Sequence, residues 1–218
     1  MTTPSLLLAD PRTVADLRTY TARARANDDG GMRLVAAGHV LAGYVSTLRP
    51  AILGEPVPTV LGLRTMALAR GAEVDVTVSL GSVLDRLARM QGEDVEFTLP
   101  TTSVIETWAG ILPPRSGWTP VGTVACDELD EAARHGIAEV AQMLPERPGA
   151  PLVSSARTAV WGRPLDGAPG AVPAGAAFGA FSLGFLERGA EATVHTNGRW
   201  YRVSNPRGHI LVKAATVF

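Results

Sequence analysis

The chain has 218 residues, a formal net charge of −1, 46% hydrophobic residues and 19% charged residues. This composition indicates a folded globular protein with a sizeable core, and it excludes a disordered chain and one whose overall charge attracts nucleic acid. Its one cysteine, Cys126, excludes an intrachain disulfide and any cysteine-based zinc or iron–sulfur site.

A helix opens the chain. Asp10 followed by Pro11 is typical of a helix start, because the carboxylate caps free N–H groups and proline fits the first helical position. Residues 27–31 end this helix. Four strands are expected next, at Met32–Ala37, Val40–Leu48, Val60–Leu68 and Glu73–Leu80. The second of them also fits a helical spacing, but Gly38 and Gly43 would each weaken a helix by about 1 kcal/mol, which favours a strand.

A second helix and a fifth strand complete the first hundred residues. Ser82 caps the helix and Gly92 ends it. Residues 95–99 alternate apolar and polar side chains before Pro100. The order helix, four strands, helix, strand is an α+β pattern. We therefore predict mostly antiparallel sheet, with helices packed on one face.

The second half is less regular. The proline-rich residues 113–120 predict a long loop, and Asp127–Leu144 predicts a helix with acids in its first turn. A linker, Pro145–Pro151, precedes two more helices, at Leu152–Trp161 and Ala174–Leu186. We predict an N-terminal α+β half, 1–100, and a C-terminal α+β half, 101–218, which either form two domains or share one core.

Three features could carry chemistry, and each has a simpler interpretation. Cys126 precedes a helix, but the acids that follow it oppose formation of a thiolate. Glu131, His135 and Glu139 form a stripe on one helix face, which fits a solvated ion-pair stripe better than a metal site. Ser182 lies in a near match to a nucleophile elbow, although no buried strand precedes it. We expect no metal, no cofactor and no catalytic residue.

The last residues, Ala192–Phe218, contain no acid and are expected to form a three-stranded β-meander. Asn197-Gly198 predicts a two-residue turn that places His195 opposite Trp200. One face of the meander is then apolar core, and the other carries His195, Trp200 and Arg202. If the next turn also has two loop residues, Lys213 lies beside Trp200; a three-residue turn would reverse the last strand, and the first register is preferred because it keeps the core face apolar.

This second face is the candidate binding site of the chain. His195, Trp200, Arg202 and Lys213 combine an aromatic ring with positive charge, which suits an anionic or aromatic ligand. The competing interpretation is that a helix of the same protein covers Trp200 while the basic groups surround it in solvent.

Several runs resemble an uncharacterised protein family of high-GC bacteria with no known activity. They include Val160–Leu165, Pro173–Phe178, Leu183–Leu186, Gly198–Trp200 and Pro206–His209. The resemblance therefore transfers neither a cofactor nor a site residue to this chain.

Because no catalytic motif is present, we predict a non-catalytic accessory protein for a small ligand or a protein partner. The first alternative is a small enzyme with a dispersed site that uses His39, His195 or His209. The second is nucleic-acid or nucleotide binding through the basic meander, although the balanced charge disfavours nucleic acid as a partner. A cytoplasmic location, no membrane segment and a possible homo-oligomer are also expected.

Overall fold

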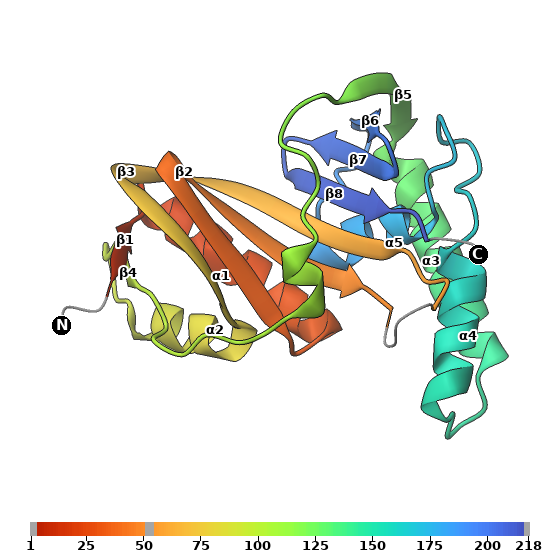
Figure 1. Cartoon of the computed structure of the whole chain (residues 1–218), viewed down its shortest axis with the longest axis horizontal. Helices are drawn as coiled ribbons and strands as arrows, with labels where there is room; N and C mark the ends of the chain where they lie inside the picture. The colour runs from red at the N-terminus through yellow and green to blue at the C-terminus, as the bar shows by residue number, and fades with distance from the viewer. Residues whose placement is uncertain (1–3, 51–54, 216–218) are drawn as a thin grey trace. The chain divides into compact units, whose positions relative to one another are not determined.

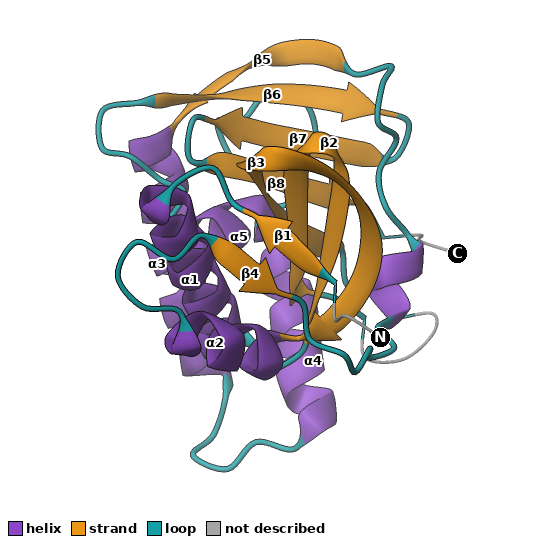
Figure 2. Cartoon of the chain, turned by 90° about the vertical axis from the view of Figure 1, so that its left-hand side faces the viewer, coloured by secondary structure: helices purple, strands orange, loops and turns teal. Residues whose placement is uncertain are grey.

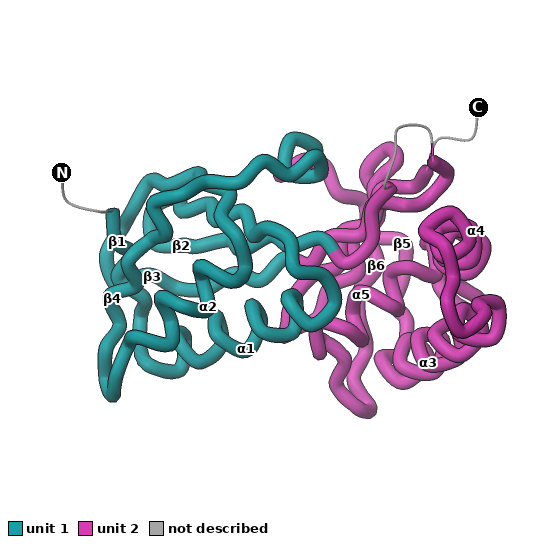
Figure 3. Tube along the Cα trace, turned by 90° about the horizontal axis from the view of Figure 1, so that it is seen from below, with its two compact units in different colours: residues 1–46, 63–111 teal, residues 47–62, 112–218 magenta. Residues whose placement is uncertain are grey.

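The computed structural model describes residues 4–50 and 55–215. The chain divides into two compact units, coloured separately in Figure 3. The first contains residues 1–46 and 63–111, and the second contains residues 47–62 and 112–218. The second unit therefore takes one segment from the N-terminal half of the sequence. Both units combine helices with antiparallel strands, so the predicted α+β class is confirmed.

Two helices of the first unit lie side by side, as Figures 1 and 2 show: α1 (Pro11–Asn27) and α2 (Leu80–Arg89). The predicted cap of α1 is present, since the Asp10 carboxylate accepts a hydrogen bond of 2.7 Å from the backbone N–H of Thr13. Ser79, rather than Ser82, caps α2. Each helix buries one apolar side, which includes Leu17 on α1 and Leu87 on α2.

Four strands were expected between these helices. The structure has two long strands there instead, β2 (Gly31–Leu48) and β3 (Thr59–Ser79). Gly38 and Gly71, which lie between the expected strands, are inside β2 and β3. Gly38 has a φ of +56°, and a Cβ on Gly71 would lie 3.6 Å from the carbonyl oxygen of Gly38. The two glycines thus face each other where both strands continue, and neither ends its strand.

A small second sheet pairs the start of the first unit with its later part. Strand β1 (Ser5–Leu7) runs antiparallel to β4 (Glu96–Thr98), and the two lie next to each other in Figure 2. Leu6 faces Phe97 in this pair, and both side chains are fully buried. A 3₁₀ turn, η1 (Thr107–Gly110), follows. Strand β1 and this turn were not predicted.

The second unit contains β5 (Thr119–Ala125), β6 (Glu191–Asn197), β7 (Trp200–Asn205) and β8 (Gly208–Lys213). Among the described residues, one sheet has the strand order β2-β3-β8-β7-β6-β5. The predicted meander β6-β7-β8 is confirmed, and its strands are neighbours in Figure 1. The predicted loop at 113–120 is wrong at its end, because β5 begins at Thr119.

The helices of the second unit are α3 (Cys126–Met143), α4 (Ala150–Trp161) and α5 (Gly175–Leu183). Helix α5 packs on β8 and ends earlier than expected, because Gly184 adopts a left-handed conformation with a φ of +67°. A Cβ on Gly179 would lie 2.9 Å from the Val60 side chain, so glycine permits the close approach of α5 to the sheet. No helix among the described residues is long and apolar enough to cross a membrane.

Candidate functional site

The register of the meander decides which side chains share a face. Trp200 pairs with Asn197, not with His195, so the loop between β6 and β7 consists of Gly198 and Arg199. Only the glycine has a positive φ, of +57°, which suits the first loop position. The predicted register is therefore wrong by two residues. A shift of two keeps every side chain on its predicted face.

The preferred register of the last strand is confirmed. Asn205 pairs with Gly208 around a two-residue loop, and Trp200 pairs with Lys213. The core face of the meander is buried, as the packing of α5 against Ile210 requires. The opposite face carries His195, Trp200, Arg202 and Lys213 together, on three adjacent strands.

Trp200 is almost buried, with an exposed fraction of 7%. The Lys213 ammonium lies 6.0 Å from the centroid of its ring, at the outer limit of a cation–π contact. A different tryptophan, Trp118, is half exposed and directly precedes β5. Its ring centroid lies 4.8 Å from the guanidinium carbon of Arg202. We call these five residues, His195, Trp200, Arg202, Lys213 and Trp118, the meander site.

Two polar atoms of the meander site are buried and have no hydrogen-bond partner among the described residues: His195 Nδ1 and Arg202 Nε. The two residues face each other directly across β6 and β7. Burial, followed by the nearby charge of Arg202, holds the pKa of His195 below its ordinary value. Burial likewise lowers the pKa of Arg202. His195 and Arg202 thus each have one buried nitrogen without a hydrogen-bond partner among the described residues.

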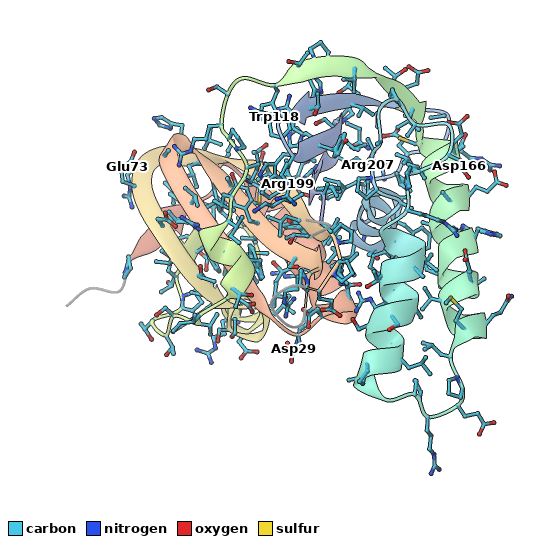
Figure 4. The ribbon with its side chains drawn as sticks, turned by 45° about the vertical axis from the view of Figure 1, so that its right-hand side comes forward. Asp29, Glu73, Trp118, Asp166, Arg199 and Arg207 are labelled. Atoms are coloured by element: carbon cyan, nitrogen blue, oxygen red, sulfur yellow. The ribbon has the colours of Figure 1, made fainter. Side chains whose placement is uncertain are left out.

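Two hydrogen bonds hold the segment that carries Trp118. The side-chain amide of Asn197 donates to the carbonyl oxygen of Ser116 at 2.8 Å. The indole N–H of Trp118 donates to the carbonyl oxygen of Pro114 at 2.9 Å. The first bond attaches this segment to the hairpin of β6 and β7, where Arg199, marked with Trp118 in Figure 4, occupies the loop. Trp118 is therefore fixed beside Arg202.

The structure also places the three features whose simpler interpretations were preferred. Glu139 forms a two-point ion pair with Arg163, with an N–O distance of 2.6 Å, instead of joining Glu131 and His135 around a metal. No group of three potential metal ligands occurs in the described part of the chain. Cys126 is buried at the start of α3, and Ser182 lies inside a helix without the preceding strand of a nucleophile elbow. His39 and His209 contact the Leu68 carbonyl and the Ser204 hydroxyl, respectively.

A second charged surface, on the helices of the first unit, was not predicted as functional. Helix α1 carries four exposed arginines, and α2 adds the half-buried Arg86 and the exposed Arg89; the four on α1 are Arg12, Arg18, Arg23 and Arg25. Of the two acids on these helices, Asp16 is paired with Arg64 at 2.7 Å. The sequence shows these arginines, but cations near the C-terminal end of a helix are also expected because they compensate the helix dipole.

Family models match nearly the whole sequence. The model described as a domain of unknown function, DUF8010, matches residues 1–110. A second domain of unknown function, DUF8185, matches residues 113–217. Because the first model covers half of the chain, the chain belongs to the DUF8010 family. The expected membership of an uncharacterised family is confirmed, and its high-GC bacterial origin stays a prediction. A search of curated proteins found no match.

The fold is that of bacterial sliding clamps. A Caulobacter crescentus DNA polymerase sliding clamp is similar, with a TM-score of 0.53, 12% sequence identity and 98% of this chain covered. A Eubacterium rectale protein described as a DNA polymerase III beta subunit has a TM-score of 0.54 and 7% identity, also over 98% of this chain. The chain spans 65–66% of the length of these two proteins.

These similarities correct the functional prediction. A clamp fold extends over nearly the whole chain, so the prediction of an accessory protein for an unknown small ligand is wrong. The fold does not indicate the two alternatives either, the enzyme with a dispersed histidine site and nucleic-acid binding through the meander.

Proposed function

We propose that this protein is a clamp-like, non-catalytic protein that assembles from more than one copy and associates with duplex DNA. The observation that carries the proposal is the similarity of almost the entire chain to DNA polymerase sliding clamps. The expectation against nucleic acid rested on net charge alone, and a local surface can bind DNA in a protein of balanced charge. A cytoplasmic location and a division into two domains belong to the same proposal.

The charge of the helices supports a particular DNA-facing surface. Helices α1 and α2 together carry six arginines and two acids, whereas α3 carries five acids, one arginine and one histidine. Phosphates are attracted to the first pair and repelled by α3. We assign DNA contact to the exposed side of α1 and α2, which we call the α1–α2 arginine face.

The spacing of the arginines on α1 fits this role. Arg12 and Arg23 are eleven residues apart, about three turns, and Arg18 and Arg25 are seven apart, about two turns. Each pair therefore forms a row along the helix. Between the rows the exposed side chains are small: Ala15, Thr19, Ala22 and Ala26. A phosphate backbone can lie over these small side chains, with arginines on both sides of it.

DNA binding is tested by fluorescence anisotropy with a labelled short duplex over a range of salt concentrations. We expect log K to fall linearly with log salt, and the double variant Arg12→Gln/Arg23→Gln to reduce this slope by about 2. The matched control is Arg134→Gln on α3, which should leave the slope unchanged. If wild-type protein does not bind duplex DNA even at low salt, the proposed function is wrong.

Assembly is tested separately by light scattering on the wild-type protein, with a monomer mass of 22.8 kDa. We expect a species heavier than one chain, because a chain that spans only two thirds of a clamp needs copies of itself to surround DNA. A strictly monomeric protein that binds linear and circular DNA equally would contradict the clamp role and leave simple DNA binding.

A further inference from the structure

Among the described residues, no carboxylate is paired with Arg202 or Lys213 of the meander site. Four arginines elsewhere in the chain are paired with acids: Arg33 with Asp75, Arg64 with Asp16, Arg163 with Glu139 and Arg207 with Glu187. In the part that the structure describes, the charges of Arg202 and Lys213 contact indole rings, at 4.8 and 6.0 Å from the ring centroids. No acid occurs anywhere from Ala192 to Phe218. Within the described part of the chain, this positive charge therefore has no acidic partner.

The two unpartnered atoms belong to residues that are paired across two neighbouring strands and share one face of the sheet. His195 and Arg202 are directly opposed in an antiparallel pair, which places their Cβ atoms about 5 Å apart. Arg202 Nε carries a hydrogen and can only donate, and His195 Nδ1 donates in one of its neutral tautomers. A carboxylate has two acceptor oxygens and forms a charge-assisted bond with a guanidinium. It therefore matches the geometry of this pair.

We propose that the meander site binds an aspartate or glutamate side chain from an acidic segment of a protein partner. The carboxylate accepts from Arg202 and His195, while Lys213 adds positive charge and the half-exposed Trp118 contacts the apolar part of the segment. The proposal goes beyond the DNA-binding role and uses a different surface.

The burial of the cations favours a peptide over nucleic acid. Arg202 and Lys213 are half-buried beside indole rings, and Arg202 Nε has almost no exposed area. The phosphates of a duplex lie on a broad backbone and need exposed cations, such as Arg12 and Arg89 of the α1–α2 arginine face.

The test uses the full-length protein and a fluorescein-labelled peptide of glutamate and glycine, with an equally long peptide of glutamine and glycine as the control ligand. We expect saturable binding of the acidic peptide and at least about tenfold weaker binding of the neutral one. Arg202→Gln should weaken binding of the acidic peptide about tenfold, and Lys213→Gln by a smaller factor. The matched control, Arg207→Gln, lies on the same meander but pairs with Glu187, and should leave the affinity unchanged.

Several results would overturn the proposal. The first is a lack of saturable binding of the acidic peptide, and the second is equal affinity for the acidic and neutral peptides. The third is an affinity for the acidic peptide that is unchanged in both Arg202→Gln and Lys213→Gln. If Arg202→Gln fails to fold, as near-ultraviolet circular dichroism would show, Lys213→Gln alone decides. If oligothymidylate displaces the peptide at equal affinity, the site belongs to nucleic acid and the proposal is also wrong. The variant Arg12→Gln/Arg23→Gln should bind the peptide normally, which separates this inference from the proposed DNA contact.

Discussion

His195 lies opposite Arg202, and the folded protein disfavours the protonated form of this histidine. The pKa of His195 is lowered mainly by burial and further by the positive charge of Arg202. In the unfolded chain the histidine has its ordinary pKa of about 6.5. Between that value and the lower folded pKa, the unfolded state binds more protons than the folded state. The histidine's contribution to stability is therefore complete above about pH 6.5 and is lost as the pH falls through the folded pKa.

We predict that His195→Gln reduces the loss of stability at acidic pH. Urea unfolding midpoints measured between about pH 8 and pH 5 should decline less in this variant than in the wild type, because no imidazole remains to be protonated. Arg207→Gln, on the same meander, should decline as the wild type does. Parallel declines in His195→Gln and the wild type would show that His195 does not contribute to the pH dependence.

At the scale of elements, α3 and α4 cross at a single glycine. A Cβ on Gly136 would lie 2.4 Å from the ring of Trp161, which is buried and stacks on Phe178 at a centroid distance of 4.8 Å. Real Cβ atoms do not approach a ring so closely, and the stacked indole has little room to move. The absent side chain of Gly136 sets the distance between the two helices.

We predict that Gly136→Ala lowers the free energy of unfolding by about 2 kcal/mol, because overpacking outweighs the gain in helix propensity. Gly81→Ala is the matched control, since its Cβ would meet only the Arg25 guanidinium, at 3.6 Å. That variant should be neutral or slightly stabilised. Both are measured by urea denaturation, and equal stabilities of the two variants would contradict the packing argument.

Patterns in the sequence predicted the elements whose apolar residues repeat regularly, such as α1, α3 and the meander. Strand β5 was missed because Pro120 and Gly122 are poor strand residues, and the structure accommodates them at a register shift on the edge of the sheet. That omission also hid Trp118, whose place beside Arg202 depends on the pairing of β5 with β6. The four other residues of the meander site were predicted together, because a register error of two residues preserves the faces.

For the whole molecule, the second unit depends on residues 47–62 from the N-terminal half. Gly175 and Gly179 of α5 approach Val60, and a Cβ on Gly179 would lie 3.0 Å from the Thr47 hydroxyl. Strand β8 also has β3 as its neighbour in the sheet. Without these residues, the apolar side of α5 and the edge of β8 would be exposed to water.

We predict that a fragment of residues 112–218 does not form the native second unit. Its amide spectrum by nuclear magnetic resonance should be poorly dispersed, and it should aggregate at concentrations at which the full chain remains dispersed. Adding residues 47–62 as a synthetic peptide is the control, which should restore part of the native spectrum. A well-dispersed spectrum of the fragment alone would mean that the second unit folds independently.

The segment 47–62 has a consequence for how such a chain can change over evolutionary time. The two family models meet between residues 110 and 113, as if two modules had been joined there. Recombination at that point would nevertheless separate the second module from strands that complete its sheet. The two modules must therefore be inherited together. Substitutions at Val60 in the first module are constrained by Gly175 and Gly179 in the second.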